Sequence, residues 1–112
     1  MKLRIKNKII VAILDKPKNL EKIYLFQKKV KKNKDDFNLI EGEDVIILIT
    51  NLQYKDEVNE LFKLHLIKLN ENLVQISMLF DPLLETTPGV VTYVYGLLAQ
   101  KGINIREEMS CW

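Results

Sequence analysis

The order in which strand-like and helix-like patterns alternate along the chain constrains its fold more than any other feature of the sequence. Apolar and β-branched residues dominate residues 3–14, which predicts a strand, and Asn7-Lys8 interrupts the run where the strand can bend. Apolar residues then recur at helical spacing over residues 17–32, with lysines on the other side. This pattern predicts an amphipathic helix.

The middle of the chain predicts a hairpin and a second helix. Apolar runs at residues 37–40 and 45–50 are separated by a short acidic turn, in which Gly42 can adopt a positive φ. The run at 45–50 lacks alternation, so we expect a central strand that is buried on both faces. Asn51 can cap the next helix, which we expect to end near Leu64.

The next region predicts one short strand, a turn and the start of a repeat. Residues 66–69 are a short apolar run, residues 70–72 are polar, and residues 73–80 alternate. Up to residue 70 the order is βαββαβ, that of the ferredoxin-like split βαβ unit, an α+β sandwich with two helices on one face of an antiparallel sheet. We therefore expect residues 1–70 to form a first unit.

Residues 71–112 repeat the beginning of this pattern. A strand at 73–80, a helix at 88–101 and a strand at 103–112 make a βαβ segment, the first half of a second, truncated unit. Half a unit leaves a sheet edge unpaired. We therefore expect that the sequence is a fragment, or that a second copy supplies the missing edge in a homodimer or higher oligomer formed by sheet or helix pairing, including strand exchange.

Composition places the chain among globular proteins. Hydrophobic residues make up 47% and charged residues 29% of its 112 residues, enough for one ordinary domain core. No apolar run is long enough to span a membrane, and the charged start does not resemble a signal peptide. Cys111 is the single cysteine, which excludes an internal disulfide. We expect a cytoplasmic protein without a membrane partner.

Charge is distributed unevenly along the chain. Residues 1–34 hold twelve Lys or Arg against two acidic residues, whereas residues 35–112 hold five against thirteen. The lysines at residues 28–34 can attract an acidic partner, or can be a solvated face at the negative end of a helix dipole. Aromatic residues and arginines are not interleaved with them, so we expect no nucleic-acid binding by this chain alone.

The sequence gives no pattern for catalysis or for metal binding. His65 is the only histidine and has no ligand cluster around it, and Cys111 has no neighbouring base. The acidic turn at residues 41–44 does not have the spacing of a calcium loop. Glu107 and Glu108 are adjacent on one predicted strand, so they point to opposite faces. We expect no catalytic residue, no metal and no cofactor.

The stretch ETTPGVVTYVYGLLAQKGINI, residues 85–105, predicts a helix with well-defined ends. Thr87 is a side-chain cap, Pro88 suits the first helical position and Gly102 suits the left-handed position after the last turn. Gly89 and Gly96 each cost a helix about 1 kcal/mol. Gly89 can let a carboxylate approach free N–H groups, and Gly96 can let another element approach. Alternatively, Gly89 eases a tight turn and Gly96 packs against the sheet.

This stretch resembles the first βαβ segment of an ACT domain, the amino-acid-sensing module of aspartokinases and other proteins of amino-acid metabolism. That family has an x-P-G-V turn after a strand, a small residue in the middle of the helix, and G-I-N-I at the start of the next strand. All of these occur in residues 87–105. Residues 3–70 match only in the order of elements. Tandem units are similar to aspartokinase regulatory regions and to archaeal proteins with two ACT units.

The resemblance implies an amino-acid effector between the turn and the second strand, commonly across an interface between units. N–H groups near the turn would hold its carboxylate, and strand carbonyls would hold its ammonium. Arg106 stands where lysine-sensing aspartokinases present an acidic residue, which disfavours a basic effector. The residues that inherit ligand-binding roles are Thr87, Gly89, Val90, Val91, Asn104, Ile105 and Arg106, with Ser110 and Cys111 further along the strand.

The resemblance therefore implies an allosteric regulatory module that binds an amino acid and modulates a fused or associated enzyme or regulator, such as aspartokinase. The alternative is a ligand-free dimerisation or interaction module of the same fold. A third hypothesis, a small regulator of transcription, needs a DNA-binding segment or partner, because the sequence contains no helix-turn-helix pattern.

Overall fold

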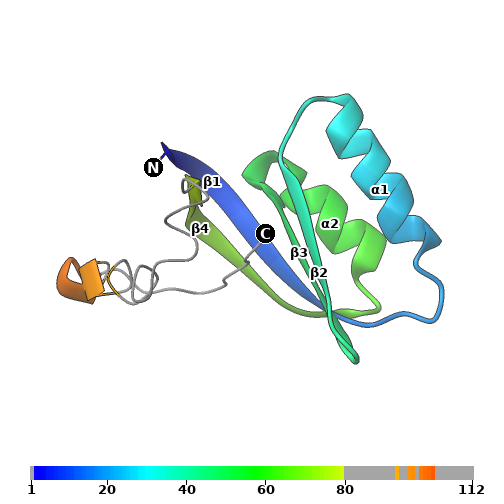
Figure 1. Ribbon diagram of the computed structural model, residues 1–112. Coiled ribbons are helices and arrows are strands. Elements are labelled where there is room, and N and C mark those ends of the chain that lie inside the picture. Colours follow the sequence, from blue (N-terminus) through cyan, green and yellow to red (C-terminus); the bar gives the residue numbers. More distant parts are fainter. Residues whose placement is uncertain (1, 80–92, 94–95, 98, 103–112) are drawn as a thin grey trace. The chain divides into compact units, whose positions relative to one another are not determined.

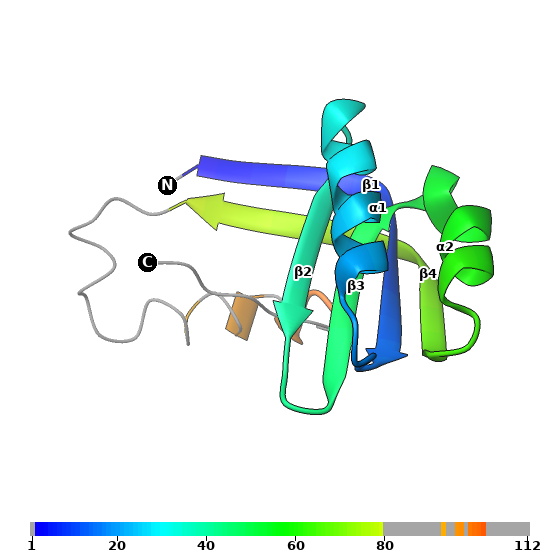
Figure 2. The same ribbon diagram turned by 90° about the vertical axis from the view of Figure 1, so that its right-hand side faces the viewer.

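The structure, a computed structural model, describes residues 2–79, 93, 96–97 and 99–102 (Figure 1). A four-stranded sheet has the strand order β2-β3-β1-β4, and β3 pairs antiparallel with both β1 and β2. Both helices lie on one face of this sheet (Figure 2). The described elements are β1 (Lys2–Asp15), α1 (Glu21–Lys32), β2 (Phe37–Glu41), β3 (Val45–Asn51), the 3-10 helix η1 (Leu52–Tyr54), α2 (Lys55–Phe62) and β4 (Leu66–Leu79).

This architecture confirms an α+β fold and is compatible with the predicted ferredoxin-like unit. The chain divides into two compact units, one of residues 5–76 and the other of residues 1–4 and 77–112. The helices α1 and α2 lie entirely in the unit of residues 5–76, together with β2, β3 and most of β1 and β4. The assignment of residues 71–112 to half of a second ACT unit stays a prediction.

The core lies between the sheet and the two helices. Because side chains alternate along a strand, Ile46, Leu48 and Thr50 of β3 are buried, whereas Ile47 and Ile49 are half-buried. The prediction that this strand is buried on both faces is therefore wrong in part, since the helices cover only one of them. The buried hydrophobic cluster consists of Ile10, Ala12, Leu14, Ile23, Phe26, Val30, Phe37, Ile46, Leu48, Tyr54, Val58 and Phe62.

The predicted hairpin forms, but its glycine acts differently from the expectation. Gly42 donates its N–H to the Val45 carbonyl at 2.9 Å, which closes the turn between β2 and β3. Its φ is not positive; instead, a Cβ at this position would lie 3.2 Å from the same carbonyl. Glycine therefore avoids a tight contact between a Cβ and the Val45 carbonyl in this turn.

Helix α1 begins four residues later than the predicted start, because Asn19 determines its first turn. The Asn19 Oδ1 accepts the Glu21 N–H at 2.8 Å, and the preceding residues Lys16–Lys18 do not adopt a helical backbone. Three lysines in the last turn, Lys29, Lys31 and Lys32, lie at the negative end of the helix dipole, as the sequence indicates.

Helix α1 ends in a Schellman arrangement with a lysine in the left-handed position. Lys34 has a φ of 60° and donates its N–H to the Lys31 carbonyl at 3.0 Å, and Asp35 donates to the Val30 carbonyl at 3.1 Å. Glycine adopts this conformation without the steric penalty of a Cβ.

We expect Lys34→Gly to raise the free energy of unfolding by about 1 kcal/mol, because the left-handed strain is removed while both hydrogen bonds remain. Urea unfolding at neutral pH measures this change. Lys32→Gly is the matched control, since Lys32 lies inside the helix, where glycine costs about 1 kcal/mol relative to alanine. Equal effects of the two substitutions would contradict the Schellman assignment.

The turn predicted at residues 70–72 is wrong. The strand β4 continues from Leu66 to Leu79, and the run predicted as a new strand at 73–80 is its second half. Within this strand Asn72 has a φ of 60°, a backbone conformation that asparagine tolerates better than most residues. The neighbouring strand β1 is equally long, and only its second half, from Ile9 to Asp15, pairs with β3. The first half of β1 runs beside β4 (Figure 2).

The second helix, predicted to follow Asn51 and to end near Leu64, starts as the 3-10 helix η1 and continues as α2, which ends at Phe62. In the later segment, residues 93, 96–97 and 99–100 are helical, and Gly102 has a φ of 71°, as predicted for a residue after the last turn. Gly96 is exposed, and a Cβ there would meet no described heavy atom within 4 Å. Both interpretations of this glycine, close approach of another element and packing against the sheet, stay predictions.

Candidate functional site

The ligand-binding residues implied by the ACT resemblance lie outside the described residues. Their positions relative to one another are therefore not described, and the proposed site stays a prediction. The described Gly102 agrees with the end of the helix in that motif. The residues concerned are Thr87, Gly89, Val90, Val91, Asn104, Ile105 and Arg106, together with Ser110 and Cys111.

The equivalent strand-helix turn of the first unit, between β1 and α1, is closed by its neighbours. Lys16 donates its backbone N–H to the Asp44 carbonyl at 2.9 Å and its ammonium to the Gly42 carbonyl at 3.2 Å. The Glu21 N–H is occupied by Asn19, and the Glu21 carboxylate lies in the first turn of the helix. A negative side chain at this position disfavours an effector carboxylate, so this turn lacks the features of an ACT effector site.

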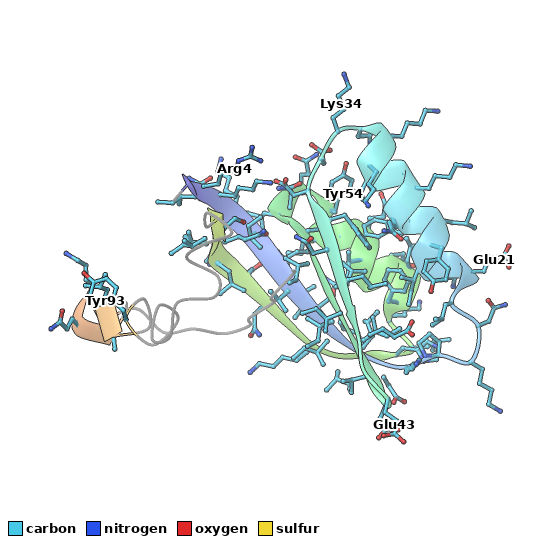
Figure 3. The ribbon with its side chains drawn as sticks, viewed as in Figure 1. Arg4, Glu21, Lys34, Glu43, Tyr54 and Tyr93 are labelled. Carbon is cyan, nitrogen blue, oxygen red and sulfur yellow. The ribbon has the colours of Figure 1, made fainter. Side chains whose placement is uncertain are left out.

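A polar network occupies the opposite end of this unit, where α1 ends and α2 begins. Figure 3 shows Tyr54 and Lys34 at this end and Glu43 at the other. Asp36 is its centre: the Asp36 N–H donates to Asn51 Oδ1 at 2.9 Å, and Asn51 Nδ2 donates to Asp36 Oδ2 at 3.0 Å. The Thr50 hydroxyl donates to the Asp36 carbonyl at 2.7 Å, and the Lys6 ammonium donates to the carboxylate.

The prediction that Asn51 caps the second helix is therefore wrong. Asn51 stands at the position before η1, but its side chain makes no capping hydrogen bond. Both ends of its amide are instead engaged by Asp36, which β3 and β2 bring beside it. The Asn51 side-chain amide thereby holds Asp36, the residue that directly precedes β2.

The pKa of the Asp36 carboxyl lies below its usual 3.8, because Lys6 donates a hydrogen bond to the charged form, Asn51 donates a second, and these outweigh partial burial. The carboxylate therefore stabilises the fold at pH values above the unfolded-state pKa. This stabilisation decreases as the pH falls through the lower folded-state pKa.

We expect the free energy of unfolding of Asp36→Asn to decrease less at acid pH than that of the wild-type protein. Urea unfolding of both proteins between pH 7 and pH 3 measures the effect. The wild-type protein should lose more stability over the acid range than the variant. Parallel profiles would show that the Lys6 and Asn51 contacts contribute nothing in the folded state.

A second carboxylate of the network is also engaged. The buried Tyr54 donates its hydroxyl to Asp35 Oδ2, and Gln53 Nε2 donates to the same oxygen at 3.1 Å. Asn33 Nδ2 donates to the Tyr54 hydroxyl at 3.2 Å. Within the described residues, no group of three or more His, Cys, Asp or Glu side chains could hold a metal ion. The arrangement ties α1, β2 and η1 together.

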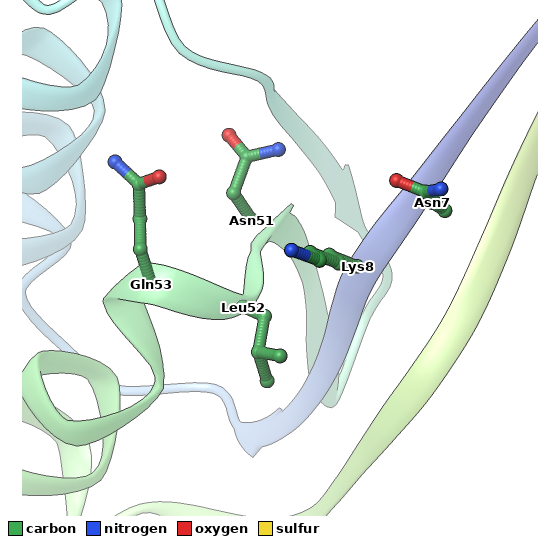
Figure 4. A pocket seen from close by; sticks show the side chains of 5 residues that line it. All are labelled: Asn7, Lys8, Asn51, Leu52 and Gln53. Atoms are coloured by element: carbon green, nitrogen blue, oxygen red, sulfur yellow. The ribbon is translucent and has the colours of Figure 1, made fainter.

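An open pocket of about 420 Å³ lies beside this network (Figure 4). Figure 4 shows the Lys8 side chain extending from β1 toward Asn51 and the start of η1. One signal for this pocket is visible in the sequence, the interruption of the first apolar run by Asn7-Lys8. No sequence pattern indicates that Asn51, Leu52 and Gln53 form the opposite wall. The lining residues are Asn7, Lys8, Asn51, Leu52 and Gln53.

The sequence predicts a structural role for His65. Its backbone links the end of α2 to the end of β1 by two hydrogen bonds. Its N–H donates to the Phe62 carbonyl and its carbonyl accepts the Asp15 N–H, at 2.9 and 2.8 Å. The helices that the structure describes are too short or too polar to cross a membrane.

No protein-family model and no curated protein matches the chain. Among solved structures, the chain is similar to a protein in a crystal structure of aspartokinase alpha and beta subunits, with a TM-score of 0.57. The similarity covers 99% of this chain and 81% of that chain, at 12% identity. At this identity it shows the fold alone, and it is consistent with an ACT-like fold.

Proposed function

We propose that the chain is an amino-acid-binding regulatory module of the ACT type, which modulates a fused or associated enzyme or regulator. The observation that carries the proposal is the similarity in fold to an aspartokinase subunit structure over 99% of the chain. The motifs Thr87-Pro88-Gly89-Val90 and Gly102-Ile103-Asn104-Ile105 supply the second, independent support.

The effector site belongs to residues 87–106 in this proposal. N–H groups near Gly89 and Val90 hold the effector carboxylate, and carbonyls at Asn104 and Ile105 hold its ammonium. The closed β1–α1 turn of the first unit supports this choice, because the Glu21 N–H is already occupied and the Glu21 carboxylate is nearby. The first unit then acts as a scaffold.

Regulation in this proposal comes from a difference in affinity between two states. An effector bound at an interface between units stabilises one arrangement of those units over another, and it shifts their equilibrium only by the ratio of its affinities. A partner that binds one arrangement preferentially is then controlled by the effector.

A thermal-unfolding scan of the chain against each of the twenty amino acids tests the proposal. A ligand at 100 times its Kd stabilises by about 2.7 kcal/mol, which shifts the midpoint of a small domain by several degrees. Gly89→Val and Asn104→Ala should abolish the shift, whereas the control Asn59→Ala, on α2, should retain it. The absence of a shift with every amino acid would contradict the proposal.

A ligand-free dimerisation module is the second candidate, and exposed apolar side chains favour it. On α1, Tyr24 is 50% and Leu25 is 61% exposed, and β2 is an edge strand of the sheet. Sedimentation analysis distinguishes the candidates. Self-association that is unchanged by every amino acid but weakened by Leu25→Lys supports this second function, and association that depends on one amino acid supports the first.

A further inference from the structure

The pocket beside the polar network offers hydrogen-bond donors that the fold itself does not use. Its lining comes from β1, from the end of β3 and from η1. The Lys8 ammonium makes no ion pair or hydrogen bond with any other residue that the structure describes. The neighbouring Lys6, in contrast, is paired with Asp36.

The backbone at Lys8 explains why two consecutive residues line one pocket. Successive side chains of a regular strand point to opposite faces. Lys8 has a φ of 55°, which interrupts this alternation, and Asn7 and Lys8 both border the pocket. A lysine rarely adopts this conformation, since its Cβ crowds the following carbonyl.

The opposite wall is held in place by the network. Asn51 Nδ2 uses one N–H on Asp36, and Gln53 Nε2 uses one on Asp35, so each amide retains a second N–H. These donors lie on the wall toward which Lys8 extends (Figure 4).

The lining of the pocket favours an anion, because Lys8 is its one charged residue and has no described partner. Asp36 is paired with Lys6, whereas Asp35 accepts hydrogen bonds from the neutral Tyr54 and Gln53 and keeps its negative charge. The pocket has a volume of about 420 Å³ and is open to solvent.

We propose that this pocket binds a small oxyanion, a carboxylate-bearing or phosphate-bearing metabolite, with Lys8 supplying the charge and Asn7, Asn51 and Gln53 supplying hydrogen bonds. The proposal is independent of the amino-acid effector site, because its residues lie in a different unit from residues 87–106.

An NMR titration of the ¹⁵N-labelled full chain tests this site, with sodium citrate and inorganic phosphate as separate probes at constant ionic strength. We expect saturable shifts of the Lys8, Leu52 and Gln53 amides with at least one probe. A response to citrate alone identifies a carboxylate ligand, and a response to phosphate alone identifies a phosphate ligand.

Lys8→Met should weaken binding about tenfold, as expected for the loss of one charge-assisted hydrogen bond, and Asn7→Ala should weaken it less. Lys68→Met, at an exposed lysine of β4, is the matched control and should bind like the wild type. If Lys8→Met does not fold, Asn7→Ala decides the question. The absence of saturable shifts with either probe, or unchanged affinity in the folded pocket variants, would overturn the proposal.

Discussion

Phe26→Ala is expected to lower the free energy of unfolding by about 3–5 kcal/mol, the range for removing a large buried aromatic side chain. Phe26 is 3% exposed, and its ring contacts three other rings edge to face. The centroid distances are 5.9 Å to Phe37, 5.7 Å to Tyr54 and 5.9 Å to Phe62. These rings come from β2, η1 and α2, so the substitution opens a cavity where these elements meet α1.

The matched control is Leu25→Ala at the adjacent position of the same helix. Leu25 is 61% exposed, so we expect a change within about 0.5 kcal/mol. Urea unfolding followed by far-UV circular dichroism compares the two variants. Similar losses of stability at both positions would mean that α1 does not bury the face that the structure shows.

Asn51→Asp is expected to destabilise the protein by about 1–3 kcal/mol, the cost of leaving partly buried polar groups without partners. Aspartate cannot donate a hydrogen bond at neutral pH, and its charge would face the Asp36 carboxylate, which now accepts from Asn51 Nδ2 at 3.0 Å. The substitution separates two interpretations of Asn51, because aspartate caps a helix as well as asparagine does. If the role of Asn51 were to cap the helix, Asn51→Asp would cause no loss of stability.

Urea unfolding at pH 7 measures the effect, and Asn38→Asp on the neighbouring strand β2 is the control. Asn38 is half-exposed and forms no side-chain hydrogen bond that is described, so its change should stay within about 0.5 kcal/mol. An Asn51→Asp protein as stable as the wild type would favour the capping role and contradict the pairing with Asp36.

The order of the elements was predictable because each depends on local pattern. The apolar residues of α1 recur at helical spacing, and the structure buries Ile23, Phe26 and Val30 on that face. The alternation along β3 was hidden by its composition, since Ile47 and Ile49 are as apolar as the buried Ile46. Sequence alone does not reveal which face of such a strand the helices cover.

The features that sequence missed depend on contacts between distant residues. The role of Asn51 follows from Asp36, fifteen positions earlier, which only the pairing of β2 with β3 brings close. The pocket likewise forms because β1 pairs with β3 in a register that sets Ile9 opposite Asn51, next to Lys8. A positive φ at Lys8 or Asn72 has no local sequence signal comparable to a glycine.

Equilibrium dialysis against a mixture of all twenty amino acids tests the central claim most directly. After equilibration, amino-acid analysis of the two compartments shows which amino acid the chain retains. The account predicts enrichment of one acidic or neutral amino acid on the protein side, approaching about one molecule per chain, and loss of that enrichment in Gly89→Val. Equal concentrations of every amino acid on both sides would contradict it.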